Sequence, residues 1–488
     1  MSRTPGTPRL AAPDLRGWKV RAGGYAAVVD VPPQWRGSTT ALAGLRPFPS
    51  SPGTPTLGVP LGPALGDQPG AVGPIVCADP ISWFERGKLL GNPSAFVLGM
   101  PGLGKSTVVR RWVLGLAAAG VTPLILGDLK PDYTALIGAL GGQVIRLGRG
   151  AGVLNVLDPG GMAQVADRLP VGLAAQMREE AHTRRVTMVT GLLALARASA
   201  PSEQERLGLT AALRELATPG RPTPVLGDLM ALLHQPTPGM LAATLVADPD
   251  QFAAQMRTLL HSMRNLLDSP LGAMFNGPTT TRLDLSSPAL AVDVSGVPDE
   301  ANSQAAALLA VWADGFGAVE AANALTDAGL APQRRFLIVL DELWRAIRAG
   351  AGMVDRLDAL TRLNRAHGVG QVMITHSLAD LDALPDPADR AKASGFVERA
   401  GMLALGGLPH AELDSVRRVV DLTEAEARLV TSWSSPPSLA ARRTAPPGVG
   451  HFLLKVGGRP GVPFVLRLTD AEIAAAVHDT NQRWAGTS

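Results

Sequence analysis

A glycine-rich run constrains the fold most, because it fits the phosphate-binding P-loop pattern at every required position. An apolar stretch, Ala95–Leu98, precedes the run and predicts a buried strand, and Val108–Ala119 after it predicts a helix. Glycines let backbone N–H groups surround a phosphate chain, and a helix N-terminus adds a favourable partial charge. The run consists of Gly99, Met100, Pro101, Gly102, Leu103, Gly104, Lys105, Ser106 and Thr107. We therefore expect it to bind a nucleoside triphosphate.

The second half of a nucleotide site is expected after another buried strand. Lys105 is placed to reach the β- and γ-phosphates, and Ser106 to bind Mg²⁺. The metal needs a carboxylate partner, and hydrolysis needs a group that orients water. Asp341 and Glu342 directly follow the apolar run Phe336–Leu340. We expect Asp341 to serve the metal and Glu342 the water; alternatively, both acids only begin the next helix, where they suit its dipole.

Two further elements carry candidate site residues. The strand predicted at Gln371–Thr375 is followed by His376, which we expect to contact the γ-phosphate or the attacking water. The alternative is a surface histidine at a strand end. Upstream, Arg362 and Arg365 lie on one face of a predicted helix. Such an arginine can stabilise transition-state charge in a neighbouring subunit, but it can equally be solvated or salt-bridged.

The order of predicted elements indicates one α/β domain interrupted by helices. Short apolar runs predict strands on both sides of a helical block, as in a parallel sheet covered on both faces. Because these strands must share one sheet, we expect a mainly parallel sheet with an all-helical insertion. The expected segments are a Gly/Pro-rich N-terminal segment that is irregular or a small β unit (1–70), the first part of the core (71–160), the insertion (161–278), the second part of the core (279–433), a linker (434–450), and a C-terminal hairpin and helix (451–488).

Composition limits the class of protein. Apolar residues make up 46% of the 488 residues and charged residues 18%, which fits a globular chain with a large core. The net charge is only +3, so charge gives DNA binding little support. Cys77 is the only cysteine, which excludes an intramolecular disulfide and a cysteine-cluster metal site. The apolar stretch 305–322 contains Asp314 and Glu320 and is too polar for a convincing membrane span. We expect a cytoplasmic protein, with peripheral attachment at the inner face of the cell membrane left open.

The motif order and the insertion together resemble the HerA/FtsK superfamily of hexameric pumping ATPases. Within it, the chain is most similar to the large cytoplasmic ATPase of type IV secretion and conjugation systems, the TraC-like family. Beyond the P-loop, the resemblance rests on residues 127–133, 154–159 and 272–278, and it covers about residues 75–485. It implies a RecA-like fold, ATP with Mg²⁺, a homo-hexameric ring, and a role in powering macromolecular transfer within a membrane-associated complex. It also implies that Arg365 acts in trans. The family usually has Gln at the position of His376, whose hydrogen bonding depends on pH.

Two other functions agree with much of the same pattern. A DNA translocase or coupling protein of the superfamily would share the site, although such proteins commonly carry N-terminal membrane helices and none is predicted here. DNA binding is not shown by the sequence. A module that uses ATP to assemble a complex with little turnover is the third candidate. The complete set of Lys105, Asp341 and Glu342 favours an enzyme over such a module.

Overall fold

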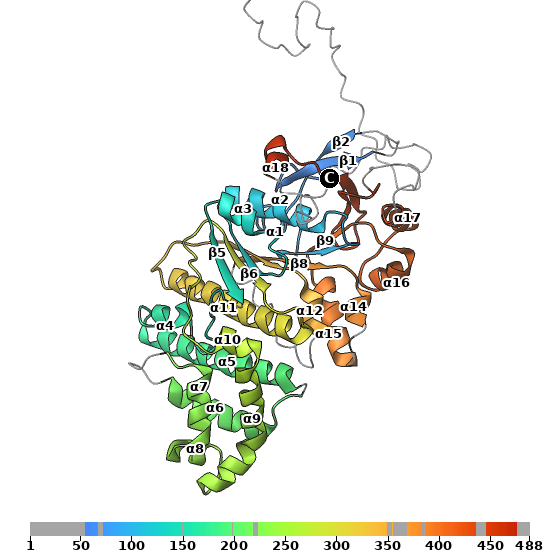
Figure 1. Ribbon diagram of the computed structural model, residues 1–488. Helices are drawn as coiled ribbons and strands as arrows, with labels where there is room; N and C mark the ends of the chain where they lie inside the picture. The colour runs from blue at the N-terminus through green and yellow to red at the C-terminus, as the bar shows by residue number, and fades with distance from the viewer. Residues whose placement is uncertain are drawn as a thin grey trace, which may run out of the picture. The chain divides into compact units, whose positions relative to one another are not determined.

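One eleven-stranded sheet joins strands from both sides of the helical segment (Figure 1). The computed structural model describes residues 54–66, 72–148, 150–197, 199–217, 223–348, 354, 368–382, 384, 386–435 and 446–475. In chain order the strands are β1 (Pro60–Leu65), β2 (Val72–Cys77), β3 (Ser94–Leu98), β4 (Thr122–Asp128), β5 (Gln143–Gly148), β6 (Leu290–Gly296), β7 (Phe336–Leu340), β8 (Val369–Thr375), β9 (Met402–Leu405), β10 (His451–Lys455) and β11 (Val462–Val465). Their order in the sheet is β2-β1-β11-β10-β9-β3-β8-β7-β4-β6-β5.

The sheet has a parallel and an antiparallel part. All neighbours from β9 to β5 run parallel, whereas β9, β10, β11, β1 and β2 pair antiparallel. Every residue of β3, β7 and β8 is buried. Most residues of these strands are apolar, as expected where helices cover both faces.

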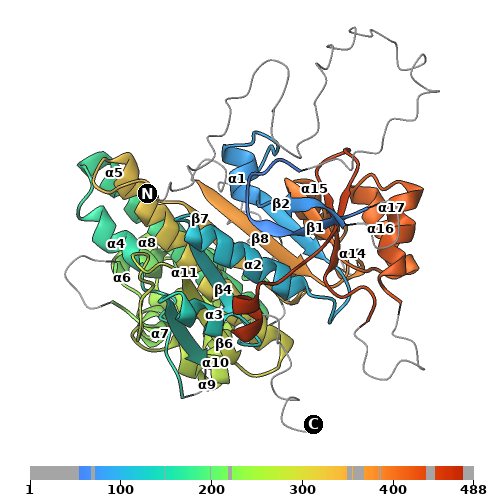
Figure 2. The same cartoon turned by 90° about the horizontal axis from the view of Figure 1, so that it is seen from above.

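Helices lie on both faces of the sheet, and the helices between β5 and β6 pack against one of these helices rather than against the sheet. In chain order the helices are α1 (Pro80–Glu85), α2 (Lys105–Ala118), α3 (Thr134–Ala139), α4 (Gly161–Ala166), α5 (Val171–Arg197), α6 (Glu203–Leu216), α7 (Leu226–His234), α8 (Pro238–Ala243), α9 (Pro249–Asp268), α10 (Pro270–Phe275), α11 (Ala301–Asp327), α12 (Leu343–Arg348), α14 (Ala379–Asp382), α15 (Pro387–Glu398), α16 (His410–Val419), α17 (Glu424–Ser432) and α18 (Asp470–Ala474). Figure 2 looks onto the side where α1, α2 and α3 lie over the strands. Along β3, Ala95 and Val97 belong to the core on this side, whereas Phe96 and Leu98 belong to the core that contains α11 and α15.

Helix α11 links the sheet to the helical segment. Trp312 Nε1 donates a hydrogen bond of 2.7 Å to the carbonyl oxygen of Leu126 in β4. Gly315 allows this approach, because a Cβ there would lie 2.5 Å from the Leu126 side chain. Helix α11 also packs against α4 and α5. In the described part of the chain, α11 is the one helix with the length and composition of a membrane span, but 78% of its most apolar window is buried inside the protein.

The expected fold class is confirmed, with one difference at the N-terminal side. All described helices between β5 and β6 belong to the predicted insertion, and the predicted strands form one mainly parallel sheet. However, β1 lies within the N-terminal segment (1–70), which is predicted to be irregular or a small β unit, and it pairs with β11 of the main sheet. Its two prolines and Gly62 disfavour a regular strand, but the pairing with β2 is irregular where they lie, which accommodates them. Of the predicted linker, residues 436–445 are outside the described part.

Candidate functional site

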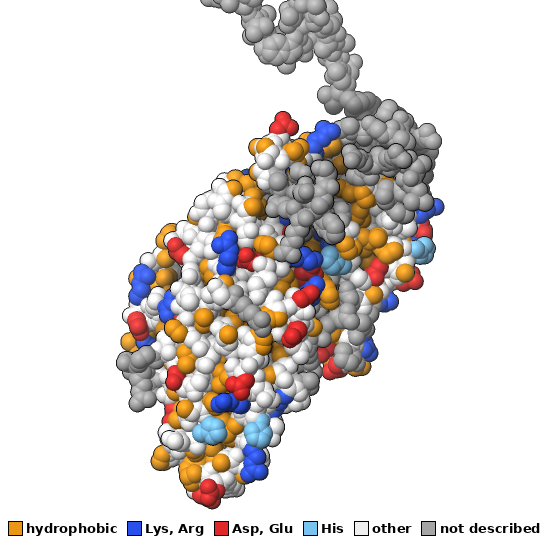
Figure 3. Space-filling model, in the orientation of Figure 1, with side chains coloured by type: hydrophobic (Ala, Val, Ile, Leu, Met, Phe, Trp, Pro, Cys, Tyr) orange, Lys and Arg blue, Asp and Glu red, His pale blue; other side chains and the backbone are white. Residues whose placement is uncertain are grey.

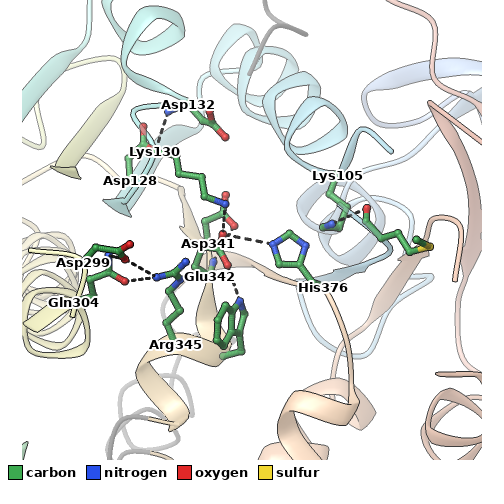
Figure 4. A network of polar contacts seen from close by, with 12 residues as sticks. Lys105, Asp128, Lys130, Asp132, Asp299, Gln304, Asp341, Glu342, Arg345 and His376 are labelled. Carbon is green, nitrogen blue, oxygen red and sulfur yellow. Dashed lines mark hydrogen bonds and ion pairs between the residues drawn. The ribbon is translucent and has the colours of Figure 1, made fainter. Parts of the chain in front are cut away.

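Three adjacent parallel strands bring the predicted site together. Strand β8 pairs with β3 on one side and with β7 on the other. The P-loop follows β3, His376 follows β8, and Asp341 and Glu342 follow β7. Because parallel strands end at the same edge, these residues meet at the carboxyl edge of the sheet, where open α/β folds bind ligands. Figure 4 shows His376 between Glu342 and Lys105.

Lys105 is buried at the centre of the P-loop. Its Nζ atom donates hydrogen bonds to the carbonyl oxygens of Gly99, at 2.6 Å, and Met100, at 3.0 Å. Burial lowers the pKa of Lys105 to about 8, against the opposing effect of the nearby Asp341 and Glu342 carboxylates. The surroundings of Lys105 therefore disfavour its charged form. A negatively charged ligand beside the ammonium group would favour that form again.

The backbone of the P-loop fits a phosphate chain. Gly102 and Gly104 have φ angles of +78° and +99°, which favour glycine. Within the described part of the chain, no acceptor is paired with the N–H groups of Gly102, Leu103 and Gly104. Gly104 caps α2 without a side-chain hydrogen bond, so the helix N-terminus stays open to an anion. The flanks of the loop are anchored, since Met100 N donates to Gly407 O.

Asp341 lies at the end of β7 with its carboxylate held on both oxygens. Tyr133 Oη donates to Oδ2 at 3.1 Å, and the backbone N–H of Glu342 donates to Oδ1 at 2.8 Å. Burial, followed by the neighbouring Glu342 charge, raises the pKa of Asp341 to about 6. A cation at this position would favour the ionised carboxylate.

The donor set is consistent with Mg²⁺ bound mainly through a nucleotide. Among the described residues, no group of three or more His, Cys, Asp or Glu side chains could hold a metal alone. Mg²⁺ commonly combines substrate phosphates and waters with one or two protein ligands. Ser106, the second residue of α2, and Asp341 are the protein groups that would hold it beside the phosphates.

Glu342 is held in a specific conformation immediately before α12. Its φ angle is +52°, which is unusual for a residue other than glycine. Lys130 Nζ lies 2.8 Å and His376 Nε2 lies 3.5 Å from Oε1. Trp344 Nε1 donates to Oε2 at 2.6 Å. Burial alone would raise the pKa of Glu342, but hydrogen bonds with His376 and Lys130 outweigh it and hold the pKa well below its usual range.

The loop after β4 completes the site, although none of its residues was predicted to have a role there. Lys130 and Tyr133 on this loop contact Glu342 and Asp341, respectively. Asp128 fixes the loop by accepting hydrogen bonds from the N–H groups of Asp132, at 2.9 Å, and Tyr133, at 2.8 Å. Burial raises the pKa of Asp128 to about 7. The segment 127–133 contributed to the family resemblance and could have indicated this loop. No chemical pattern in the segment assigned it to the site.

The structure thus brings Lys105, Ser106, Asp341, Glu342 and His376 to one edge of the sheet. The predicted trans-acting arginines cannot be placed in the same way. Arg362 and Arg365 lie outside the residues that the structure describes.

A glycine-rich loop before a helix, a buried lysine within it, and paired acids two strands away at the same sheet edge form the arrangement of a P-loop α/β fold with a candidate nucleotide site. Among solved structures, VirB4 of Thermoanaerobacter pseudethanolicus has the same fold, with a TM-score of 0.63 and 18% sequence identity. The match covers 86% of this chain and 99% of VirB4. The fold expected from the family resemblance is therefore confirmed.

Two further matches show lower TM-scores. The plasmid coupling protein TrwB, in complex with a non-hydrolysable ATP analogue, matches with a TM-score of 0.48 and 14% identity, over 77% of this chain and 86% of TrwB. The cytoplasmic domain of the type VII secretion ATPase EccC of Thermomonospora curvata matches with a TM-score of 0.34 and 15% identity, over 88% of this chain and 31% of EccC. A comparison with protein-family models found no match, and one with curated protein sequences found none either.

Proposed function

We propose that this chain is an ATP-hydrolysing motor subunit similar to the cytoplasmic ATPases of conjugation and type IV secretion. The observation that carries this proposal is the position of Glu342. It lies beside Asp341 at the same sheet edge as the P-loop, so a water-orienting carboxylate accompanies the phosphate-binding lysine. A site for binding alone would need Lys105 and Asp341 but would have no use for Glu342.

Each residue has its own role in transfer of the γ-phosphoryl group to water. The P-loop N–H groups and Lys105 bind and orient the β- and γ-phosphates, which places the γ-phosphorus in line with a water. Glu342 orients this water and accepts its hydrogen bond. His376, between Glu342 and Lys105, donates a hydrogen bond to the γ-phosphate or the water. Bound Mg²⁺, held by Ser106 and Asp341, would supply charge neutralisation on the phosphate oxygens.

The proposed partners follow from the same reading. We propose a homo-hexamer in which Arg365, or Arg362 in its place, stabilises the neighbouring site, and a cytoplasmic position at a membrane-associated transfer complex. This assembly is what the resemblance to the TraC-like ATPases implies. Light scattering with a non-hydrolysable ATP analogue tests it. A monomeric mass at full activity would remove the trans-arginine proposal.

A DNA translocase is the second candidate within the superfamily. On the face drawn in Figure 3, the blue and red side chains of the described residues are interspersed rather than separated into regions of one charge. This distribution does not favour a DNA-binding surface on that face, because such surfaces concentrate Lys and Arg. Phosphate release at low salt with and without DNA separates the two functions. Strong stimulation by DNA would favour the translocase.

The central experiment compares phosphate release by the wild type and by Glu342→Gln. Loss of a group that orients or deprotonates water typically costs about 10²–10⁴-fold in rate, whereas ATP binding should be retained because Lys105 is intact. Glu203→Gln, an exposed change on α6 in the insertion, is the matched control and should match the wild type. Equally low rates in the wild type and Glu342→Gln, with tight ATP binding in both, would instead support the assembly module.

A further inference from the structure

We propose that Lys130 holds Glu342 in a resting position, and that the site turns over only when this contact is broken. Lys130 is then a positioning residue that limits the basal rate. The inference rests on the proposed function, because it assigns a regulator to the carboxylate that serves hydrolysis.

Both oxygens of the Glu342 carboxylate already have hydrogen-bond or ion-pair partners. Lys130 and His376 lie at Oε1, and Trp344 donates to Oε2. The residue is only 6% exposed, which leaves little room for water at either oxygen. A carboxylate that already accepts a charged donor on one oxygen and a short hydrogen bond on the other is a weak acceptor for a further proton. At least one donor must therefore leave before Glu342 can orient water.

Lys130 is the donor best able to leave. Trp344 belongs to α12, two residues from Glu342, and His376 directly follows the buried strand β8. The Lys130 side chain is 57% exposed and has a flexible four-carbon stem. Asp128 holds the backbone on both sides of Lys130 through the N–H groups of Asp132 and Tyr133. Release consequently needs only rotation of the lysine side chain and no movement of the loop.

An arriving triphosphate can compete for this lysine. Lys130 is close enough to Lys105 that its charge contributes to lowering the pKa of Lys105. Phosphates bound by Lys105 would bring several negative charges near both lysines and would weaken the hold of Glu342 on Lys130. The contact with Glu342 thus restrains the carboxylate while the site lacks a triphosphate.

The test is the steady-state rate of Lys130→Met, which keeps most of the stem and removes the charge. Because Lys130 is more than half exposed, the contact is worth little more than an ordinary exposed ion pair, and we expect kcat to rise roughly fivefold. Lys130→Arg keeps the ion pair and should stay near the wild-type rate. Lys88→Met is the control, since Lys88 is exposed and precedes β3, whereas the P-loop follows β3 at the carboxyl edge of the sheet.

One readout separates this role from a structural one. The gain in Lys130→Met must vanish when it is combined with Glu342→Gln, because Lys130 acts through Glu342.

The outcomes distinguish this inference from the proposed function. An unchanged or reduced kcat in Lys130→Met, beside a hydrolysing wild type, overturns the inference alone; a reduced kcat would assign Lys130 to phosphate binding. No phosphate release from any variant would remove the proposed function and the inference together. Thermal unfolding of each variant, compared with the wild type, shows that the rates come from folded protein.

Discussion

The buried charges at the carboxyl edge of the sheet differ from a buried ion pair in the helical segment 161–278. In the helical segment, Arg197 pairs with Glu205 through two parallel hydrogen bonds of 2.8 Å, and these bonds lower the pKa of Glu205. At the sheet edge, burial shifts the pKa values of Lys105 and Asp341 toward their neutral forms. In this buried pair each charge is satisfied by the other. The site, by contrast, keeps charges that a ligand of opposite sign would stabilise.

The largest expected effect comes from Lys105→Ala. Loss of the cation that contacts the β- and γ-phosphates should lower turnover by at least roughly 10²–10³-fold, as for other preorganised donors. Thermal stability should be unchanged or higher, because a buried, desolvated ammonium group is removed. Phosphate release and thermal unfolding of the same sample check both parts. Undiminished turnover would contradict the assignment of Lys105 to the nucleotide site. A large loss of thermal stability would contradict the view that its buried charge does not stabilise the protein without a ligand.

The opposite pattern is expected for Leu209→Ala in α6. Leu209 is fully buried in the core that the helical segment shares with the sheet. The cavity should cost roughly 2–5 kcal/mol of unfolding free energy, while the affinity for nucleotide stays the same. Thermal unfolding and titration with a fluorescent ATP analogue provide the two measurements. A weakened affinity would show that the helical segment shapes the site directly.

An intermediate effect is expected in the pH dependence of Mg²⁺–nucleotide binding. Because the pKa of Asp341 is raised to about 6, the carboxyl is protonated below that pH and must lose its proton to bind the metal. Affinity should therefore fall about tenfold for each pH unit below 6. The pKa of Glu342 lies well below its usual range, so Glu342 stays ionised there. Asp341→Asn should remove this additional slope, whereas titration of the nucleotide phosphate itself remains in both proteins. An equal slope in the variant would exclude Asp341 as its source.

The smallest effect is expected for Ser202→Ala at the start of α6. Ser202 Oγ accepts a hydrogen bond from the N–H of Glu205, and Glu205 accepts one from the N–H of Ser202. Loss of this cap should cost roughly 0.5–2 kcal/mol without any change in hydrolysis. Chemical unfolding followed by circular dichroism measures the cost. A change in kcat would indicate that the helical segment and the site are coupled.

Much of the architecture could be predicted because it depends on local sequence. Buried parallel strands are short apolar runs that can be recognised in the sequence. Topology alone brings the residues that follow such strands to one edge of the sheet. Lys105, Asp341 and Glu342 could be predicted for this reason. The contact between Lys130 and Glu342 spans 212 residues of sequence, and no local pattern reports it. Strand β1 was missed for another reason. Its prolines and Gly62 argue against a strand, yet Gly62 is needed there, because a Cβ would lie 2.0 Å from the carbonyl oxygen of Val465.

The position of β3 in the sheet has a consequence for biosynthesis. The P-loop strand pairs with β8 and β9 and with no earlier strand of the described chain, and these two begin at Val369 and Met402. While the ribosome makes the intervening segment, this mostly apolar strand has no partner along either side. Unpaired strand edges in incomplete chains are prone to aggregation. Chains that terminate early, anywhere before β8, should therefore accumulate as insoluble or chaperone-bound material rather than as a partial nucleotide-binding domain.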